Sequence, residues 1–315
     1  MERLIRKPTN SGGLSRFGRV GIWLSLWRFV KGCMGLRRTD DAAILTQLVA
    51  SLKAESEAAL QGRIGPVAVT APWVAAWADD IPVDSDINDA LVAAALEPHT
   101  REDGDLIYLS ETSAVLAANG RQLCKERWCG VDEYELRDLW PPIAYFISLT
   151  NGSVYTSFQG ARCFYRLSWD NYLGSINTNF GLDKLDQATT PDQFWDALRD
   201  HLLSAVAEFT KRQPHYSRSD FIVLTAGEAA DRPEFLGVVR SVAEGIPGIR
   251  TQHGAAKVPE VELVVSDDPA FSAARGAAFW LRMRMGWSYC DGFEFEDDPV
   301  EYGTIGEEAG GHIEL

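Results

Sequence analysis

The sequence predicts an α/β fold in which strands and helices alternate along most of its 315 residues. Three observations carry this prediction. Segments with apolar residues at helical spacing alternate with short β-branched and aromatic runs. The run at 221–225, Phe-Ile-Val-Leu-Thr, is almost wholly apolar, as expected of a strand buried on both faces. Residues 144–158 are typical of a β-hairpin, because two apolar runs flank the tight-turn pair Asn151-Gly152.

The stretch 39–140 is predicted to form a first lobe. A helix begins after Thr39, where Asp40 and Asp41 favour the start of a helix dipole, and Gly62 is expected to end it. The apolar residues of this helix recur at helical spacing: Ile44, Leu45, Leu48, Val49 and Leu52. The elements that follow are a short buried strand within 66–73, a helix at 87–96, a strand at 105–109 and a helix at 114–119 that ends at Gly120.

The stretch 141–286 is predicted to form a second lobe, because Pro141-Pro142 marks a boundary. Thr190 is a helix N-cap with Pro191 in the first turn, and this long helix has the apolar face Phe194, Trp195, Leu198, Leu202, Val206 and Phe209. The other expected elements are the hairpin, a third strand at 163–167, the buried strand at 221–225, a helix at 233–242, a strand at 261–265 and a terminal helix through Met285. Residues 287–315 are acidic and Gly-rich, which predicts a disordered tail.

Charge is distributed unevenly. The chain carries a formal net charge of −15, yet residues 1–38 hold nine Lys or Arg and one acid, a balance of +8 that leaves −23 for the rest. An acidic body repels phosphate and disfavours nucleic acid as a partner. No apolar run reaches the about 18–20 residues that span a bilayer. The basic segment 1–38 predicts a mitochondrial-type transit segment, a helix on an anionic membrane surface, or a peripheral helix at 22–30 that docks on the body.

The five cysteines are scattered, and Cys124 and Cys129 have no second pair and no nearby histidine to complete a zinc site. Free thiols in a reducing compartment are the expected state, which favours the cytoplasm. Mitochondrial targeting by residues 1–38 is the alternative.

The order of the second-lobe elements resembles a ribonuclease-H-like lobe. Four segments resemble the actin-like ATPase superfamily, most closely the ATPase domain of DnaK-type heat-shock chaperones: 39–73, 111–120, 221–235 and 268–278. The last matches an Asp-Pro-x-x-Ala-x-x-Gly-Ala-Ala helix, whose small residues permit close packing of the helix on a sheet. The resemblance implies an actin-like ATPase fold with an incomplete first lobe and a reduced second lobe.

The hairpin falls where the family has its second phosphate loop, Asp-Leu-Gly-Gly-Gly-Thr, and departs from it. Ser148 stands in place of the metal-directing aspartate. Thr150 and Asn151 replace two glycines, so the backbone loses freedom to wrap a phosphate, and only Gly152 and Ser153 match. The family's first loop, Asp-x-Gly-Thr-Thr, has no counterpart in 1–38.

The resemblance implies a nucleotide site for ATP or ADP with magnesium, bound weakly. Gly152 and Ser153 would contact phosphate, Gly227 and Glu228 the adenosine, and Asp268 would be a further nucleotide-binding residue. Glu111 matches a glutamate near the metal-bound water and is the one retained catalytic candidate. Each residue also has a purely structural interpretation: Glu111 as a polar cap, Gly227-Glu228 as an ordinary strand-to-helix turn, and Asp268 as an N-cap.

Phosphoryl transfer depends on a metal and on charged groups held at the phosphates, most of which the sequence lacks. We therefore expect a non-hydrolysing pseudoenzyme that binds a protein partner or client and binds nucleotide weakly. Two alternatives stay open. One is a working ATP-binding chaperone-type ATPase whose first loop is missing from a truncated chain. The other is a protein targeted to an organelle or membrane surface by its basic segment.

Overall fold

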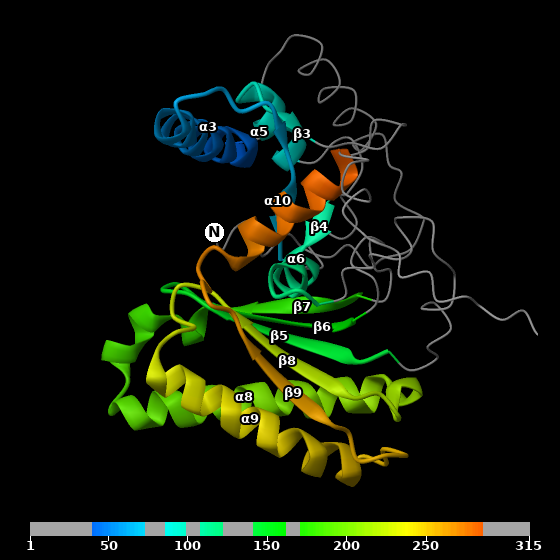
Figure 1. The fold of residues 1–315 in the computed structure, drawn as a ribbon. Coiled ribbons are helices and arrows are strands. Elements are labelled where there is room, and N and C mark those ends of the chain that lie inside the picture. Colours follow the sequence, from blue (N-terminus) through cyan, green and yellow to red (C-terminus); the bar gives the residue numbers. More distant parts are fainter. Residues whose placement is uncertain (1–39, 73–85, 99–107, 122–140, 162–170, 286–315) are drawn as a thin grey trace, which may run out of the picture.

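The computed structural model describes residues 40–72, 86–98, 108–121, 141–161 and 171–285. Its largest part is a five-stranded mixed sheet with helices on both faces (Figure 1). The predictions for 1–38 and 287–315 lie outside the described residues. Within the described part, the α/β alternation is confirmed.

The sheet has the strand order β7-β6-β5-β8-β9. Its strands are β5 (Ile143–Leu149), β6 (Val154–Gly160), β7 (Asn171–Asn177), β8 (Phe221–Ala226) and β9 (Val261–Val265). The first three are successively antiparallel, whereas β8 pairs in parallel with both β5 and β9. The predicted hairpin is confirmed, since β5 and β6 pair from Ile143↔Gly160 to Leu149↔Val154 across the Thr150–Ser153 turn.

Alternation along β5 divides the core between two faces. Ile143, Tyr145, Ile147 and Leu149 pack with the two long helices α8 (Pro191–Arg212) and α9 (Pro233–Gln252). Ala144 and Phe146 pack on the other face, under α6 (Glu111–Ala118), with α10 (Ser272–Met285) lying against α6 (Figure 1). The sheet is therefore covered on both sides, which explains why β5 and β8 are buried along their whole length and almost wholly apolar.

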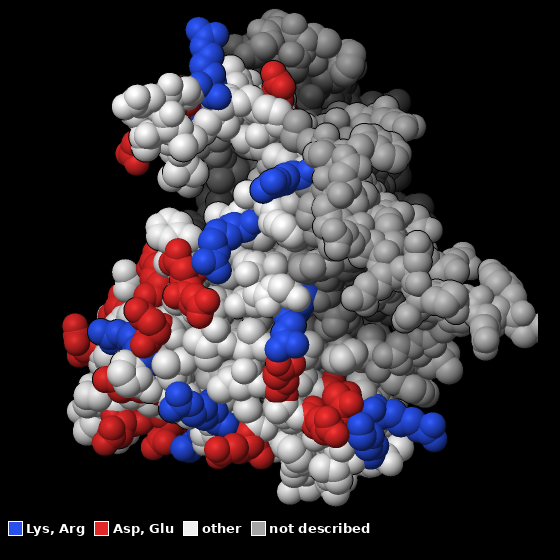
Figure 2. Space-filling view, in the orientation of Figure 1, with Lys and Arg blue, Asp and Glu red and all other residues white. Residues whose placement is uncertain are grey.

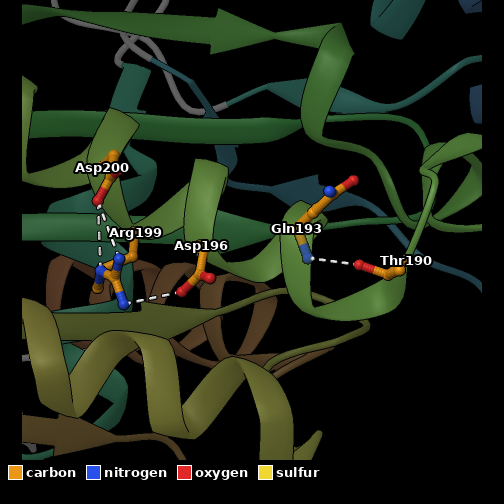
Figure 3. Close-up of polar contacts among 5 residues, drawn as sticks. All are labelled: Thr190, Gln193, Asp196, Arg199 and Asp200. Carbon is orange, nitrogen blue, oxygen red and sulfur yellow. Dashed lines mark hydrogen bonds and ion pairs between the residues drawn. The ribbon is translucent and has the colours of Figure 1, made fainter.

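Local signals specify α8. The Thr190 hydroxyl accepts a hydrogen bond from the Gln193 N–H at 3.3 Å, which confirms the predicted N-cap (Figure 3). All six residues of the predicted apolar face are buried. On the solvent side, Arg199 pairs with Asp196 at 2.9 Å and with Asp200 at 3.2 Å (Figure 3). Such exposed pairs add little stability, so α8 is held chiefly by its apolar face.

A smaller unit precedes the sheet. It contains α3 (Asp40–Leu60), α5 (Asp86–Ala93) and the short strands β1 (Pro66–Val67), β2 (Val69–Ala71), β3 (Glu97–Pro98) and β4 (Tyr108–Ser110). The strands pair in parallel as β1-β3 and β2-β4, so the single strand expected within 66–73 is divided between two small sheets.

The apolar face predicted for α3 is largely solvent-exposed. Ile44, Leu48 and Leu52 are 62%, 65% and 63% exposed, and only Leu45 and Val49 are partly buried. The helix end also differs from expectation, because Gln61 adopts the positive φ of 52° rather than Gly62.

Two further boundaries were predicted wrongly. Helix α9 continues to Gln252 through Pro247, because Ile246 and Arg250 bury their side chains beyond the expected end at Val242. The third strand of the sheet is β7, and the strand predicted at 163–167 lies outside the described residues. Helix α10 begins at Ser272, so Asp268 is not its N-cap and lies in a preceding turn, where its carbonyl accepts the Phe271 N–H.

Candidate functional site at the ends of the parallel strands

Five of the six candidate residues lie in three loops at one end of the sheet. Gly152 and Ser153 are in the β5–β6 turn, Gly227 and Glu228 follow β8, and Asp268 follows β9. Because β5, β8 and β9 are parallel, their carboxyl ends meet at the same edge. Ligands of open α/β sheets bind at such an edge, so this is the candidate functional site.

The β5–β6 turn uses part of its own hydrogen-bonding capacity. The Thr150 N–H donates to the Ser153 carbonyl at 2.9 Å, and the Ser153 N–H donates to the Thr150 hydroxyl at 3.2 Å. The Asn151 N–H donates to a carboxylate oxygen of Glu228 at 3.4 Å. The two loops that were predicted to share a site are therefore in direct contact.

Gly227 brings the β8–α9 connection close to the end of β5. It has φ of 101°, and a Cβ at this position would lie 2.4 Å from the Leu149 carbonyl oxygen. The Ala229 N–H donates to that same carbonyl at 3.1 Å, and the Gly227 N–H donates to the Pro269 carbonyl at 3.0 Å. Only glycine fits this close approach and left-handed conformation. The position joins all three loops, so a structural role for Gly227 is evident.

Ser148 lies beneath this contact. It is 3% exposed, and a Cβ on Gly227 would lie 2.9 Å from its hydroxyl oxygen. An aspartate at 148 would bury a charged group in this tightly packed place, at a large desolvation cost. The residue that replaces the family's metal-directing aspartate is therefore part of the packing at the end of the sheet.

A segment that sequence reasoning missed covers the turn from the other side. It contains two short 3₁₀ helices, η2 (Thr178–Phe180) and η3 (Leu182–Gln187). The Leu182 and Asp183 N–H groups donate to the Thr150 and Asn151 carbonyls at 3.2 and 2.9 Å. The run Asn177-Thr178-Asn179-Phe180-Gly181 is rich in turn formers and was the available signal.

Acidic side chains predominate at this edge of the sheet. Asp183, Glu228, Asp231, Asp267 and Asp268 lie in the loops and in η3, and Lys184 pairs with Asp183 at 3.2 Å. Figure 2 shows acidic side chains gathered at the left of the view, the side on which the parallel strands end in Figure 1. Among the described residues, no group of three or more His, Cys, Asp or Glu is arranged to hold a metal ion. This surface repels phosphate unless a cation accompanies it.

Glu111 is not brought to this edge. It begins α6, and its neighbours bind β6: the Ser110 hydroxyl donates to the Gln159 amide oxygen at 2.8 Å, and the Thr112 and Ser157 hydroxyls share a hydrogen bond of 2.7 Å. Gln159 and Ser157 lie opposite Ala144 and Phe146, well before the end of β5. Burial raises the pKa of Glu111 to about 7. The residues on either side of Glu111 thus contact β6 at Ser157 and Gln159, and not at the β5–β6 turn.

No protein-family model matches this chain, and no curated protein matches it in sequence. Among the helices of the described part, none combines the length and apolar character needed to cross a membrane.

Proposed function

We propose that this chain is a divergent member of the actin-like ATPase superfamily that binds a protein partner and does not turn over ATP. In this proposal 141–286 is a ribonuclease-H-like lobe and 39–140 is a reduced first lobe. Two features of the fold support the family assignment. The strand order β7-β6-β5-β8-β9 has three antiparallel strands followed by two parallel additions. The candidate loops after β5, β8 and β9 also converge at one edge.

The expected loss of hydrolysis rests on one observation: polar groups of the β5–β6 turn form hydrogen bonds to other parts of the same chain. Its carbonyls accept from η3, its Asn151 N–H faces Glu228, and Ser148 is buried beneath it. A phosphate would have to displace an acidic side chain of the protein itself, and the one lysine described beside the turn, Lys184, is already paired with Asp183. The described part of the chain also has no group of three or more His, Cys, Asp or Glu arranged to hold a metal ion. Positioning and charge neutralisation supply nearly all of phosphoryl-transfer catalysis, so their absence predicts no turnover.

A protein partner is proposed because the described surface combines acidity with exposed apolar side chains. Ile44, Leu48 and Leu52 lie at successive four-residue intervals on α3 and form one stripe. Exposed apolar patches of this kind mark protein–protein contacts. The cytoplasm remains the proposed compartment, on the basis of the unpatterned cysteines.

The test is calorimetric titration of the full chain with ATP and ADP in the presence of magnesium, followed by a phosphate-release assay. We expect no saturable binding tighter than about 1 mM, equivalent to about −4 kcal/mol, and no turnover above background. Circular dichroism and a cooperative thermal transition establish that the sample is folded. Saturable micromolar binding with turnover would instead establish the working ATPase alternative.

A further inference from the structure

Glu228 has a position that the family resemblance does not explain. The left-handed conformation at Gly227 and the hydrogen bond from the Ala229 N–H to Leu149 hold the chain on either side of it. Ala229 is therefore attached to the end of β5, where the β5–β6 turn begins, and the Gly227 N–H is attached to the Pro269 carbonyl in the loop after β9. Its carboxylate reaches across to the Asn151 N–H, between residues 77 positions apart in the sequence. The fold therefore places the Glu228 carboxylate against the β5–β6 turn.

The turn itself offers two adjacent backbone donors. The Thr150 and Ser153 N–H groups are used within the turn, at 2.9 and 3.2 Å. The Asn151 N–H meets Glu228, and among the described contacts the Gly152 N–H has no acceptor. A Cβ on Gly152 would have nothing within 4 Å, so the space beside this donor is open. Consecutive N–H groups in a turn form a concave site that favours an anion.

The other side of the turn is already occupied. The Leu182 and Asp183 N–H groups take the Thr150 and Asn151 carbonyls, and a Cβ on Gly181 would lie 2.5 Å from the Asn151 carbonyl oxygen. This contact holds the carbonyl groups of the turn in place, while the Asn151 N–H donates to Glu228. The carboxylate is therefore the chain's own ligand at that position.

We propose that Glu228 is an internal anion that blocks a phosphate-binding turn formed by Asn151 and Gly152. The inference rests on the proposed function, since it supplies a reason why the wild-type protein binds nucleotide no more tightly than about 1 mM. The ligand class is a phosphate group, either free or carried by a nucleotide. Replacing Glu228 removes a negative charge and releases the Asn151 N–H, which leaves two adjacent donors for an incoming phosphate oxygen.

The experiment compares the full-length wild type with Glu228→Ala and Glu228→Gln, and uses Glu234→Ala as the matched control. Glu234 is an exposed acid in the first turn of α9, so its replacement changes the net charge equally without touching the turn. Each protein is titrated with inorganic phosphate, pyrophosphate and ATP, with and without magnesium. Binding is followed by calorimetry and by the backbone amide NMR signals of Asn151 and Gly152.

The expected result is a gain of affinity in both Glu228 variants of about tenfold or more for at least one phosphate ligand. The Asn151 and Gly152 signals shift with the same saturation, and Glu234→Ala behaves as the wild type. A gain with all three ligands identifies the phosphate group itself as the ligand, whereas a gain with ATP alone identifies a nucleotide site.

Three results overturn the proposal. The folded Glu228 variants gain no affinity; Glu234→Ala gains as much as they do, which indicates a general charge effect; or phosphate already shifts Asn151 equally in the wild type. These results are distinguishable from failure of the proposed function. Micromolar ATP binding and turnover by the wild type would refute that function. If neither the wild type nor the Glu228 variants bind any of the phosphate ligands, only the blocking role of Glu228 is refuted.

Discussion

Glu111 shows how burial alone changes the chemistry of a side chain. It occupies the first turn of α6, where a carboxylate would benefit from the helix dipole, yet desolvation raises its pKa to about 7. The hydroxyls of Ser110 and Thr112 beside it are committed to β6. The folded protein therefore holds Glu111 protonated over a range in which an unfolded chain ionises it.

This shift predicts a stability that falls with rising pH. Between the ordinary value of 4.5 and about 7, the folded state binds the proton of Glu111 and the unfolded state releases it. The contribution of Glu111 is thus fully present below pH 4.5 and is lost as pH rises toward 7. Glu111→Gln removes the dependence, and we expect it to be more stable than the wild type at pH 8 by at most about 3 kcal/mol.

Urea unfolding of both proteins at pH 4.5, 6 and 8 measures this difference. Burial lowers the pKa of His201, which destabilises the fold as pH falls below the ordinary histidine range, so its slope has the opposite sign. Because His201 is present in both proteins, the variant-minus-wild-type difference cancels it. A difference that stays constant with pH would show that Glu111 is not held protonated.

Residue-scale predictions from the sequence succeeded where the determining signal is local. Thr190 was identified as a cap because the capping bond joins it to Gln193, three positions along the chain. The contact of Glu228 with Asn151 could not be predicted, since the fold alone brings together two residues 77 positions apart. Asp268 shows the reverse error: a plausible local cap was overridden, and the helix begins at Ser272.

At the scale of elements, the crossing of α6 over α10 depends on one glycine. A Cβ on Gly276 would lie 1.7 Å from the Ala114 carbonyl oxygen, so the two helices are in backbone contact. The small residues of 268–278 predicted close packing of this helix on the sheet, whereas the close approach at Gly276 is to the backbone of helix α6. Each helix also packs toward the sheet, so separating them disturbs a buried layer.

We expect Gly276→Ala to destabilise the protein by about 1–3 kcal/mol or more, because the added methyl group forces the helices apart. Gly248→Ala is the matched control: Gly248 is an exposed residue inside α9, with nothing within 4 Å of an added Cβ. There the substitution is expected to stabilise by about 0.5–1 kcal/mol. Chemical denaturation measures both, and equal effects of the two substitutions would argue against backbone contact between α6 and α10.

Element boundaries were missed where packing overrides propensity. Glycine and proline are typical of helix ends, yet α9 continues through Gly245, Pro247 and Gly248 to Gln252. Ile246 is fully buried, and a Cβ on Gly245 would lie 2.9 Å from a Leu203 methyl carbon, so the close approach of α8 and α9 favours glycine there. Strand β7 lies at the edge of the sheet and has no continuous apolar run, because Asn, Gly and Ser interrupt its apolar residues.

At the scale of the whole molecule, the two parts differ in how completely they bury their apolar residues. The five-stranded unit has a core cluster on each face of its sheet. The smaller unit has one cluster with two buried members, Leu91 and Leu96, among the residues described. The α/β class and most elements of the larger unit were predictable, because their apolar patterns match their burial. The face of α3 was not, since its pattern implies burial that the described chain does not supply.

Because the stripe on α3 is exposed, we expect that its leucines can be replaced by charged residues without loss of the fold. Leu48→Glu combined with Leu52→Glu places charges where the side chains are 65% and 63% exposed, so we expect the free energy of unfolding to change by less than about 1 kcal/mol. Binding of a hydrophobic fluorescent dye should fall, because the stripe is an apolar surface open to water. By contrast, Leu202→Ala in the core should cost about 2–5 kcal/mol.

The charge-matched control is Gln47→Glu with Ser51→Glu, two exposed positions that adjoin the stripe on the same helix. This variant adds the same charge and removes no apolar surface, so dye binding should persist. A loss of stability in the leucine variant close to that of Leu202→Ala would show that the stripe is buried against another segment of this chain. Intact stability with lost dye binding would support α3 as the surface that a partner protein covers.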